Sequence, residues 1–257
     1  MTDDVLVRKE GTIAWIILNR PDKRNAQGLN FTPSLMAALD RVENDPEVTV
    51  AILTGKGPVF GGGGDIKEIM SVEPQDHEAE FELVRGYNKL ISKIYHFDRP
   101  IIAAMNGPAI GGGACLALAC DFVIAADTAA YHFAFGRIGL AGADMGAPFL
   151  LQRHIGAAQA SYHIMVGTTI GAEEGKSLGL FAHVVPGEEL EAKALEVAGK
   201  IASQNRRATT ITKLALRRSP EAGLDAALEY EAYLQSFAFQ SEGHKQRLGA
   251  FLDRSKG

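Results

Sequence analysis

Two glycine-dense loops in the first half of the chain constrain its fold and chemistry more than any other feature. Residues 60–65 (FGGGGD) and 106–113 (NGPAIGGG) each follow a short apolar run that contains β-branched residues, 48–53 and 101–105. Glycines at this density let the backbone approach a ligand closely and leave N–H groups free to point at it. One N–H from each loop, converging on the same carbonyl oxygen, would form an oxyanion hole, which predicts chemistry at an acyl group.

The second loop runs directly into an apolar, helix-forming stretch, residues 113–119. The positive end of that helix would face the same oxygen. Glycine runs in α/β proteins also serve as tight turns without a catalytic role. Two such runs in the same context favour the functional interpretation.

Length and composition indicate a soluble globular protein. The chain has 257 residues, 46% hydrophobic and 22% charged, enough for one large α/β domain or one domain with an appendage. No apolar run approaches the roughly 18 residues of a membrane span, and the acidic residues near the start resemble neither a signal nor a transit peptide. We therefore expect a cytoplasmic protein without a membrane partner. The formal net charge of −5 argues against a general nucleic-acid binder.

Several common functional motifs are absent or out of context. The spacing of Cys115 and Cys120 fits neither zinc ligation nor a disulfide framework, and the scattered histidines predict no metal site. Neither glycine loop has the dinucleotide-binding or P-loop pattern. Residues 175–179 (GKSLG) match the serine-hydrolase elbow, which needs a strand before the serine and a helix after it. Here helix-like residues precede Ser177 and strand-like residues follow, so we expect a plain connection.

Apolar spacing predicts alternating strands and helices up to about residue 135, then mainly helices. Thr32 before Pro33 forms an N-cap and first-turn pair that would open a helix ending near Asn44. A second helix is expected at 76–97. The expected strands are 12–19, 48–54, 101–105, 121–126 and 131–135. The fold class is therefore α/β with a helical C-terminal region.

The order and spacing of short motifs along the chain resemble those of a known family. The motifs lie at residues 17–21, 63–68, 106–107 and 250–254, and through them the chain is identified as a member of the crotonase (enoyl-CoA hydratase/isomerase) superfamily over essentially its whole length. The resemblance implies a crotonase-like spiral of ββα units at residues 1–191, carrying the CoA and oxyanion-hole loops. It also implies a helical C-terminal trimerisation region at 192–257, with trimers often paired into hexamers.

The resemblance implies an acyl-CoA thioester as substrate and, because CoA is part of that substrate, no separate cofactor. The thioester oxygen would lie between the N–H groups of Gly64 and Gly112. The positions matching CoA contacts in the family are Lys23, Arg24, Ala26, Gly62 and, from the same or a neighbouring subunit, Phe251 and Arg254. Any single one of the charged residues could equally be a solvated surface charge.

Family hydratases use two glutamates to position water and transfer its proton, and both are missing here. Alignment of the second glycine loop places Cys115 at the first glutamate position, and alignment of residues 138–139 places Phe135 at the second. Together with His132, these residues are expected to line the substrate pocket. Hydration by two glutamates therefore cannot simply be transferred to this chain.

One carboxylate, Asp144, remains in the right stretch. It resembles the aspartate of single-carboxylate crotonase homologues, although the alignment needs one extra residue. Among Ala, Gly and Met neighbours it would be partly desolvated, which raises the pKa of a carboxyl group towards a range useful for proton transfer. The alternative is that Asp144 caps a helix beginning near Gly146. We favour catalysis, because abstraction of an α-proton needs a base.

The sequence leaves three classes of function open. In the first, the oxyanion hole polarises a thioester and Asp144 moves a proton, which gives double-bond isomerisation or hydration and dehydration. In the second, Asp144 attacks the substrate or activates water, which gives substitution or hydrolysis. In the third, the chain binds CoA thioesters without catalysis, as the two missing glutamates would allow.

Overall fold

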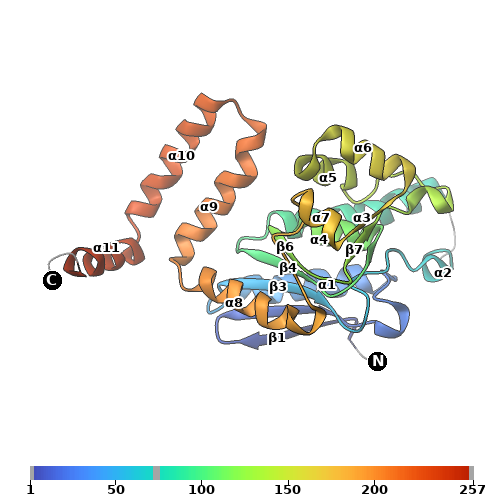
Figure 1. Ribbon diagram of the computed structural model, residues 1–257, viewed down its shortest axis with the longest axis horizontal. Coiled ribbons are helices and arrows are strands. Elements are labelled where there is room, and N and C mark those ends of the chain that lie inside the picture. Colours follow the sequence, from blue (N-terminus) through green and yellow to red (C-terminus); the bar gives the residue numbers. More distant parts are fainter. Residues whose placement is uncertain (1–2, 72–75, 255–257) are drawn as a thin grey trace.

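A six-stranded, mostly parallel sheet organises the chain in the computed structural model, which describes residues 3–71 and 76–254 (Figure 1). β1 (Val5–Glu10) pairs antiparallel with β2 (Ile13–Leu18). The sheet continues in parallel through β3 (Val50–Gly55), β4 (Ile101–Met105), β6 (Phe122–Ala126) and β9 (His183–Val185). The glycine loops follow β3 and β4, which are direct neighbours. The loops therefore emerge at the same edge of the sheet.

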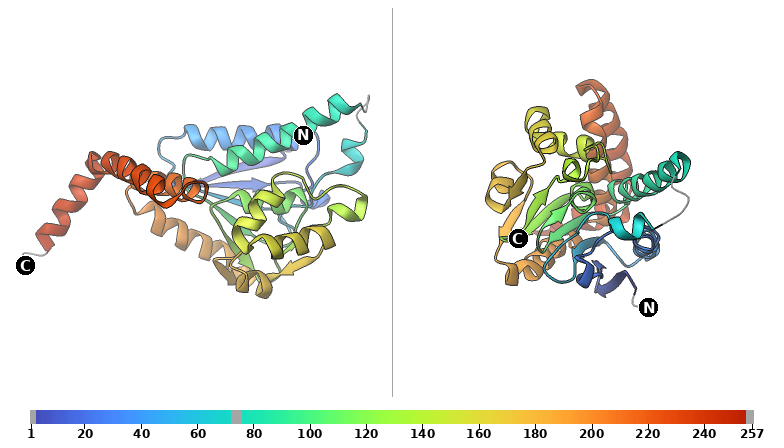
Figure 2. Two further views of the ribbon diagram at one scale, coloured as in Figure 1. Left: turned by 90° about the horizontal axis from the view of Figure 1, so that it is seen from above. Right: turned by 90° about the vertical axis from the view of Figure 1, so that its right-hand side faces the viewer.

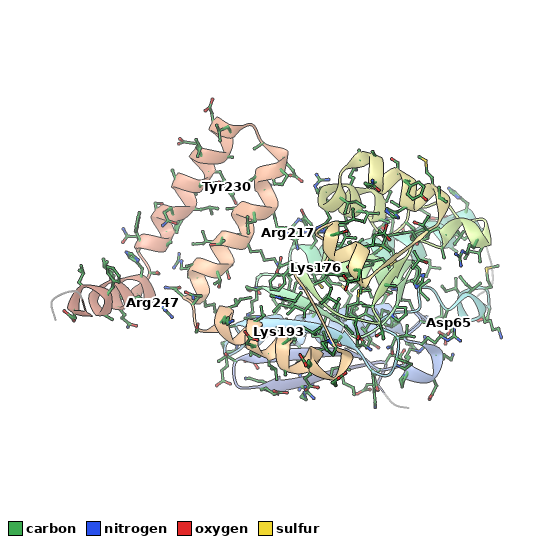
Figure 3. The ribbon with its side chains drawn as sticks, in the orientation of Figure 1. Asp65, Lys176, Lys193, Arg217, Tyr230 and Arg247 are labelled. Carbon is green, nitrogen blue, oxygen red and sulfur yellow. The ribbon has the colours of Figure 1, made fainter. Side chains whose placement is uncertain are left out.

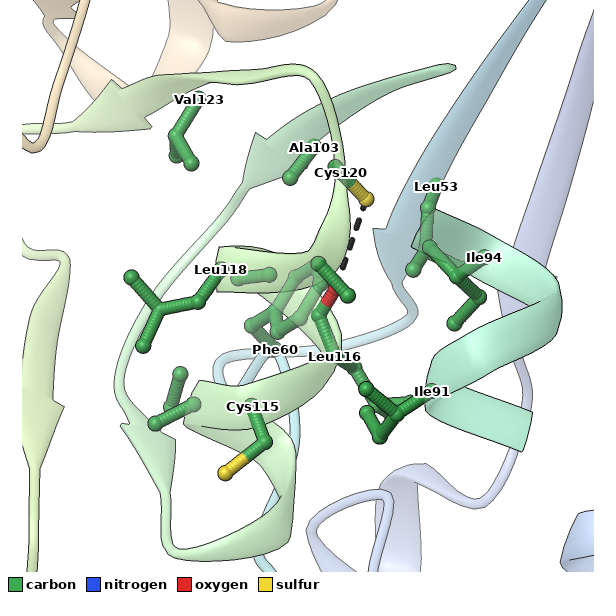
Figure 4. Packing of buried hydrophobic residues seen from close by; sticks show 14 of the residues in the cluster. Leu53, Phe60, Ile91, Ile94, Ala103, Cys115, Leu116, Leu118, Cys120 and Val123 are labelled. Atoms are coloured by element: carbon green, nitrogen blue, oxygen red, sulfur yellow. Dashed lines mark hydrogen bonds between the residues drawn. The ribbon is translucent and has the colours of Figure 1, made fainter. Parts of the chain in front are cut away.

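Both faces of the sheet are buried, as expected for parallel strands rich in Ile, Val and Ala. Leu53 and Ala103 point to one face, which packs against α1 (Phe31–Asn44), α3 (His77–Tyr95) and α4 (Gly112–Ala119). Figure 4 shows this core, with Ile94 of α3 beside Leu53 and Ile91 of α3 beside Leu116 of α4. The neighbouring positions Ile52 and Ile102 point to the other face, where α8 (Leu190–Ala202) covers them. The period-2 alternation of the strands thus divides the core in two.

A second, three-stranded sheet begins within the second glycine loop. β5 (Ala109–Ile110) and β8 (Thr169–Gly171) flank β7 (Ala130–His132). The expected strand 131–135 is therefore shorter and starts one residue earlier. Because both partner strands have at most three residues, the ladder ends at His132, and Phe135 instead begins the short 3-10 helix η2 (Phe135–Ile138).

Helix starts and connections differ in part from expectation. α1 begins at Phe31 rather than after Thr32, so Thr32 is not the N-cap, and its buried Oγ1 finds no partner among the described residues. α5 (Ala147–Ile155) and α6 (Ala157–Val166) follow β5 and β7 of the smaller sheet along the chain and precede β8. α7 (Ala172–Ser177) precedes β9, and Ser177 Oγ donates to its own helix at Glu174 O, 2.8 Å away. This order confirms that residues 175–179 are not a nucleophile elbow.

The last three helices extend away from the sheet. α9 (Arg206–Arg218) lies beside the body, while α10 (Leu224–Phe239) and α11 (Glu242–Arg254) project from it (Figures 1 and 2). Buried Lys213 Nζ lies 2.9 Å from Asp121 Oδ2, and Arg217 Nη2 lies 2.9 Å from Asp121 Oδ1, which anchors α9 to the start of β6. The expected boundary at 191/192 falls inside α8, and the division into 1–191 and 192–257 stays a prediction.

None of the helices within the described ranges combines the length and apolarity needed to cross a membrane.

Candidate active site

The two glycine loops pack against each other directly. Gly61 pairs with Ala109, and its carbonyl oxygen accepts a hydrogen bond from Ile110 N at 2.8 Å. A Cβ on Gly113 would collide with the Gly61 carbonyl, and a Cβ on Gly61 would lie 3.0 Å from Gly113 Cα. The loops can approach this closely only because both positions are glycine. Their relative position is therefore fixed by backbone contact, before any ligand arrives.

Gly64 and Gly112 are the two predicted donors, and both have an N–H available. Gln27 N donates to Gly63 O at 2.7 Å, and Asp65 N donates to Gln27 O at 2.9 Å, which bypasses Gly64. Gly112 opens α4, where N–H groups have no acceptor inside the helix. In residues 3–71 and 76–254 no acceptor is found for either N–H. A Cβ on Gly63 would lie 3.9 Å from Gly112 N, so the loops place the two donors close together.

Asp144 lies beside the first turn of α4. Cys115 Sγ contacts the Asp144 carbonyl oxygen at 3.8 Å. Burial raises the pKa of the Asp144 carboxyl group above its ordinary value of 3.8, although a hydrogen bond from the Met145 N–H opposes this. The next residues turn sharply, with φ of 46° at Met145 and 75° at Gly146. A left-handed methionine costs conformational energy, and such strain is commonest where function requires the geometry.

The alternative role of Asp144 as a helix cap finds no support in the geometry. The residue at the N-cap of α5 is Gly146, and no side chain caps the helix. Asp144 contributes only its main-chain oxygen, which accepts from Ala147 N at 2.9 Å. The carboxylate, which accepts a hydrogen bond from the Met145 N–H, thus takes no part in capping α5.

The three expected pocket residues have different surroundings. Cys115 is fully buried, and burial raises the pKa of its thiol far above the ordinary value, so it stays protonated. Phe135 is buried against the second loop, its Cε1 3.5 Å from where a Cβ of Gly111 would stand. His132 holds that loop through its main chain, because its oxygen accepts from Gly111 N at 2.9 Å. Its ring Nδ1 lies 2.7 Å from Thr169 Oγ1. Its side chain therefore has a structural partner.

A cleft of about 810 Å³ opens next to Gly64. Its lining includes Lys23 of η1 (Pro21–Lys23), Arg24 and Ala26 on one side and α2 (Ile66–Ile69) on the other. Three of the predicted CoA-binding residues thus share one cleft with Gly64, one of the two predicted donors. The fourth, Gly62, adjoins them, because a Cβ there would lie 2.7 Å from Arg24 O.

Ion pairs hold the mouth of this cleft together. Arg20 Nη2 lies 3.3 Å from Asp65 Oδ2 and 3.2 Å from Glu68 Oε2, and Lys23 Nζ lies 3.3 Å from Asp65 Oδ2. Burial works against ionisation of Asp65, yet the Glu68 N–H and Lys23 keep the pKa of its carboxyl group below the ordinary value. Exposed Arg24 has a left-handed backbone with φ of 53° and no ion pair among the described residues. It is therefore available to an anionic ligand.

Phe251 lies far from this cleft within its own chain. α11 is at the opposite end of the molecule from α2, as the positions of Arg247 and Asp65 in Figure 3 show. The Phe251 side chain is 69% exposed. A contribution of Phe251 to CoA binding would therefore have to come from a neighbouring subunit, and it stays a prediction. The side chain of Arg254 lies outside the described part of the structure, and its predicted role also stays a prediction.

Two polar side chains near the glycine loops were not expected from the sequence. Gln27 is 2% exposed and Tyr87 9% exposed, and neither Gln27 Nε2 nor Tyr87 Oη has a hydrogen-bond partner in the described part of the chain. A buried polar group left without a partner costs about 1–3 kcal/mol. Gln27 stands next to Ala26 in the sequence, but no local pattern distinguishes it from a surface glutamine. Only the three-dimensional contacts bring it to the site.

Known proteins resemble this chain along nearly its whole length. The family described as Enoyl-CoA hydratase/isomerase matches residues 8–257. A short-chain-enoyl-CoA hydratase of Clostridium acetobutylicum is 32% identical over 256 residues, covering 99% of this chain and 96% of that protein.

Solved structures show the same fold. The enoyl-CoA hydratase of Bacillus anthracis superposes with a TM-score of 0.92 at 31% identity, covering 98% of this chain and 96% of that one. An enoyl-CoA hydratase of Polaromonas sp. JS666 gives a TM-score of 0.92 at 29% identity, covering 97% of each chain. With the paired glycine loops and the adjoining cleft, these matches show that the chain belongs to the enoyl-CoA hydratase/isomerase family, an enzyme family of the crotonase fold.

Proposed function

We propose that the protein adds water reversibly to an enoyl-CoA thioester, with Asp144 as its single acid–base group. The observation that carries this proposal is the combination of two backbone N–H groups without an acceptor in the described structure, on Gly64 and Gly112, with the partly desolvated residue Asp144, whose main-chain oxygen contacts Cys115 of α4. The family match and the hydratase names of its relatives support the reaction class.

One carboxylate is enough to balance the reaction. In the hydration direction, the water oxygen bonds to C3 of the substrate while ionised Asp144 takes a proton from that water molecule. The electrons of the C2–C3 double bond move onto the thioester oxygen, where the N–H groups of Gly64 and Gly112 stabilise the enolate. Protonated Asp144 then delivers the same proton to C2, which regenerates the carboxylate. The raised pKa of Asp144 suits a group that must both accept and donate a proton.

The cleft beside Gly64 would hold the CoA part of the substrate. Lys23 and Arg24 would supply positive charge for its phosphates, with Ala26 in the same lining and Gly62 packed closely against the Arg24 carbonyl oxygen. No other cofactor is needed for this chemistry, because the thioester itself activates the C2 and C3 positions.

Asp144→Asn tests the proposal most directly. The variant keeps the side-chain shape but loses the base, so turnover of crotonyl-CoA should fall about 10²-fold or more while CoA affinity changes little. Gain of one water by the product, read by mass spectrometry, identifies hydration. Release of free CoA would instead indicate hydrolysis. Retained turnover in Asp144→Asn would remove the proposed role, and thioester binding without any turnover would favour a non-catalytic protein.

Double-bond isomerisation is a second candidate, favoured by one specific observation. The two positions that carry glutamates in family hydratases hold Cys115 and Phe135, both buried and neither ionised. Isomerisation needs only one base, which would move a proton from C2 to C4 without water. A product of unchanged mass from a 3-enoyl-CoA would distinguish this reaction from hydration.

A further inference from the structure

Gln27 links the two halves of the oxyanion hole and ends in an unpaired donor. Its main chain binds the residues on either side of Gly64, because Gln27 N donates to Gly63 O and Gln27 O accepts from Asp65 N. Its side chain reaches the other loop, where Oε1 and Nε2 lie 2.6 and 3.0 Å from the position that a Cβ of Gly112 would occupy. The Nε2 atom is buried and has no acceptor within the described ranges. A buried amide N–H without an acceptor is rare in native proteins.

Met145 completes the surroundings of this amide. Its Sδ lies 2.6 Å from the same Cβ position of Gly112, and the residue directly follows Asp144. The Gln27 amide therefore lies beside Gly112, one of the two proposed donors, and near the residue that follows the proposed base. The proposed function brings the acyl group of a bound thioester to these two residues.

Tyr87 gives a second, independent observation near the proposed base. It lies one turn before Ile91 on the same face of α3, and Ile91 Cγ2 approaches the Cβ position of Gly146 at 3.6 Å. This puts Tyr87 opposite the turn that carries Asp144. Its hydroxyl is buried without a hydrogen-bond partner in the described structure. Burial first, and then the negative charges of Asp144 and Glu68, raise the pKa of this phenol, so it remains a donor.

Two unpaired donors are poorly suited to a purely hydrocarbon acyl chain. Such a chain would bury both groups further and provide no acceptor for either. An oxygen atom on the acyl group would satisfy them. That oxygen should be uncharged, because a second carboxylate beside desolvated Asp144 would be repelled.

We infer that the acyl pocket selects thioesters whose acyl group carries a neutral oxygen, such as a hydroxyl, ether or ketone, which accepts a hydrogen bond from Gln27 with Tyr87 assisting. This inference rests on the proposed function for the position of the thioester. Gln27 is a specificity-determining residue, since it acts on the choice of acyl group rather than on the proton transfer.

Binding of saturated thioesters tests the inference without any turnover. Methoxyacetyl-CoA and butyryl-CoA differ only by an oxygen in place of a methylene, as do 3-methoxypropionyl-CoA and pentanoyl-CoA. Calorimetry on the wild type should show a preference of about tenfold or more for the oxygen-containing member of at least one pair. In Gln27→Met this preference should fall to about one, with CoA itself bound as before, and Tyr87→Phe should reduce it.

Gln152→Met and Tyr162→Phe serve as matched controls, because both side chains are exposed on α5 and α6, and neither should alter the preference. If Gln27→Met does not fold, Gln27→Glu removes the N–H donors at constant shape and should also abolish the preference. Equal binding of both pair members by the wild type overturns the inference, as does a preference that survives the loss of the Gln27 amide. Because these ligands cannot be hydrated, failure of the proposed reaction would appear separately, in the crotonyl-CoA assay.

Discussion

In the proposed mechanism Gly112 acts through its main-chain N–H at the start of α4, which no side chain can replace. It also has a sterically confined Cα, which Gln27 and Met145 both approach. These two properties, the donor and the small size, can be separated by substitution.

Gly112→Pro removes the donor at a helix position where proline is tolerated, and turnover should fall about a hundredfold or more. Gly112→Ala is the control, since it keeps the N–H and adds a Cβ that meets only the ends of the flexible Gln27 and Met145 side chains. It should lose much less activity. Steady-state kinetics on both folded variants makes the comparison, and similar losses in the two would argue for crowding instead of a lost donor.

At pH values where Asp144 is ionised and can act as the proposed base, its charge should lower the stability of the folded protein. Its folded-state pKa is raised above 3.8, so the folded protein binds this proton more tightly than the unfolded chain does. The stabilising effect of the protonated form is present at low pH and is lost as pH rises through the raised pKa. Above that range the ionised carboxylate costs stability.

Asp144→Asn should therefore unfold at a higher temperature than the wild type at pH 7, and the difference should shrink as pH falls towards the raised pKa. Thermal melts followed by circular dichroism across this range measure it. A variant that is less stable at every pH would show that the carboxylate has a structural role after all.

Among the elements, η1 and α2 form the entrance through which CoA would bind. Lys23 is already paired with Asp65, whereas Arg24 has no ion pair in the described structure, so the two residues are not equivalent. Arg24 can contribute its charge directly, while Lys23 must share it with the carboxylate.

Replacing Lys23 and Arg24 together with Glu should raise the KM for acyl-CoA far more than it lowers kcat, because phosphate contacts stay similar between the ground and transition states. Lys200→Glu combined with Arg207→Glu makes the same charge change on α8 and α9 and should leave the KM unchanged. Normal affinity in the first variant would show that the phosphates bind elsewhere.

The predictions from the sequence agree best with the structure where local sequence patterns determine the element. β4 matches its expected bounds, and the glycine loops follow their strands as predicted. Thr32 failed as a cap because α1 starts where Phe31 enters the core, so burial overrode a local capping preference. Gln27 and Tyr87 could not be found from the sequence, since the lack of a hydrogen-bond partner for their buried polar atoms in the described structure is seen only in the three-dimensional contacts.

At the scale of the whole molecule, the projecting helices leave apolar side chains in contact with solvent. Leu216 of α9, Leu224 of α10 and Phe251 of α11 are 69%, 74% and 69% exposed. Large apolar side chains exposed on three consecutive helices favour association through this region.

We therefore expect a trimer or a dimer of trimers in solution at micromolar concentration, as light scattering would measure. Leu216→Glu with Leu224→Glu should lower the measured mass and weaken acyl-CoA binding, because association and ligand binding are linked. Lys245→Glu, a change of charge on α11, is the control and should do neither. A fully active wild-type monomer would contradict this prediction.

The contact between Gly61 and Gly113 has a consequence for how the protein acquires activity. These residues follow β3 and β4, which are parallel neighbours and far apart along the chain, so their pairing requires closure of a long loop. The helices can form locally and early, but the oxyanion hole cannot exist until that pairing is complete. During refolding, the helical circular dichroism signal should therefore recover before turnover does. The delay between the two is the time that the chain takes to pair β3 with β4 in the correct register.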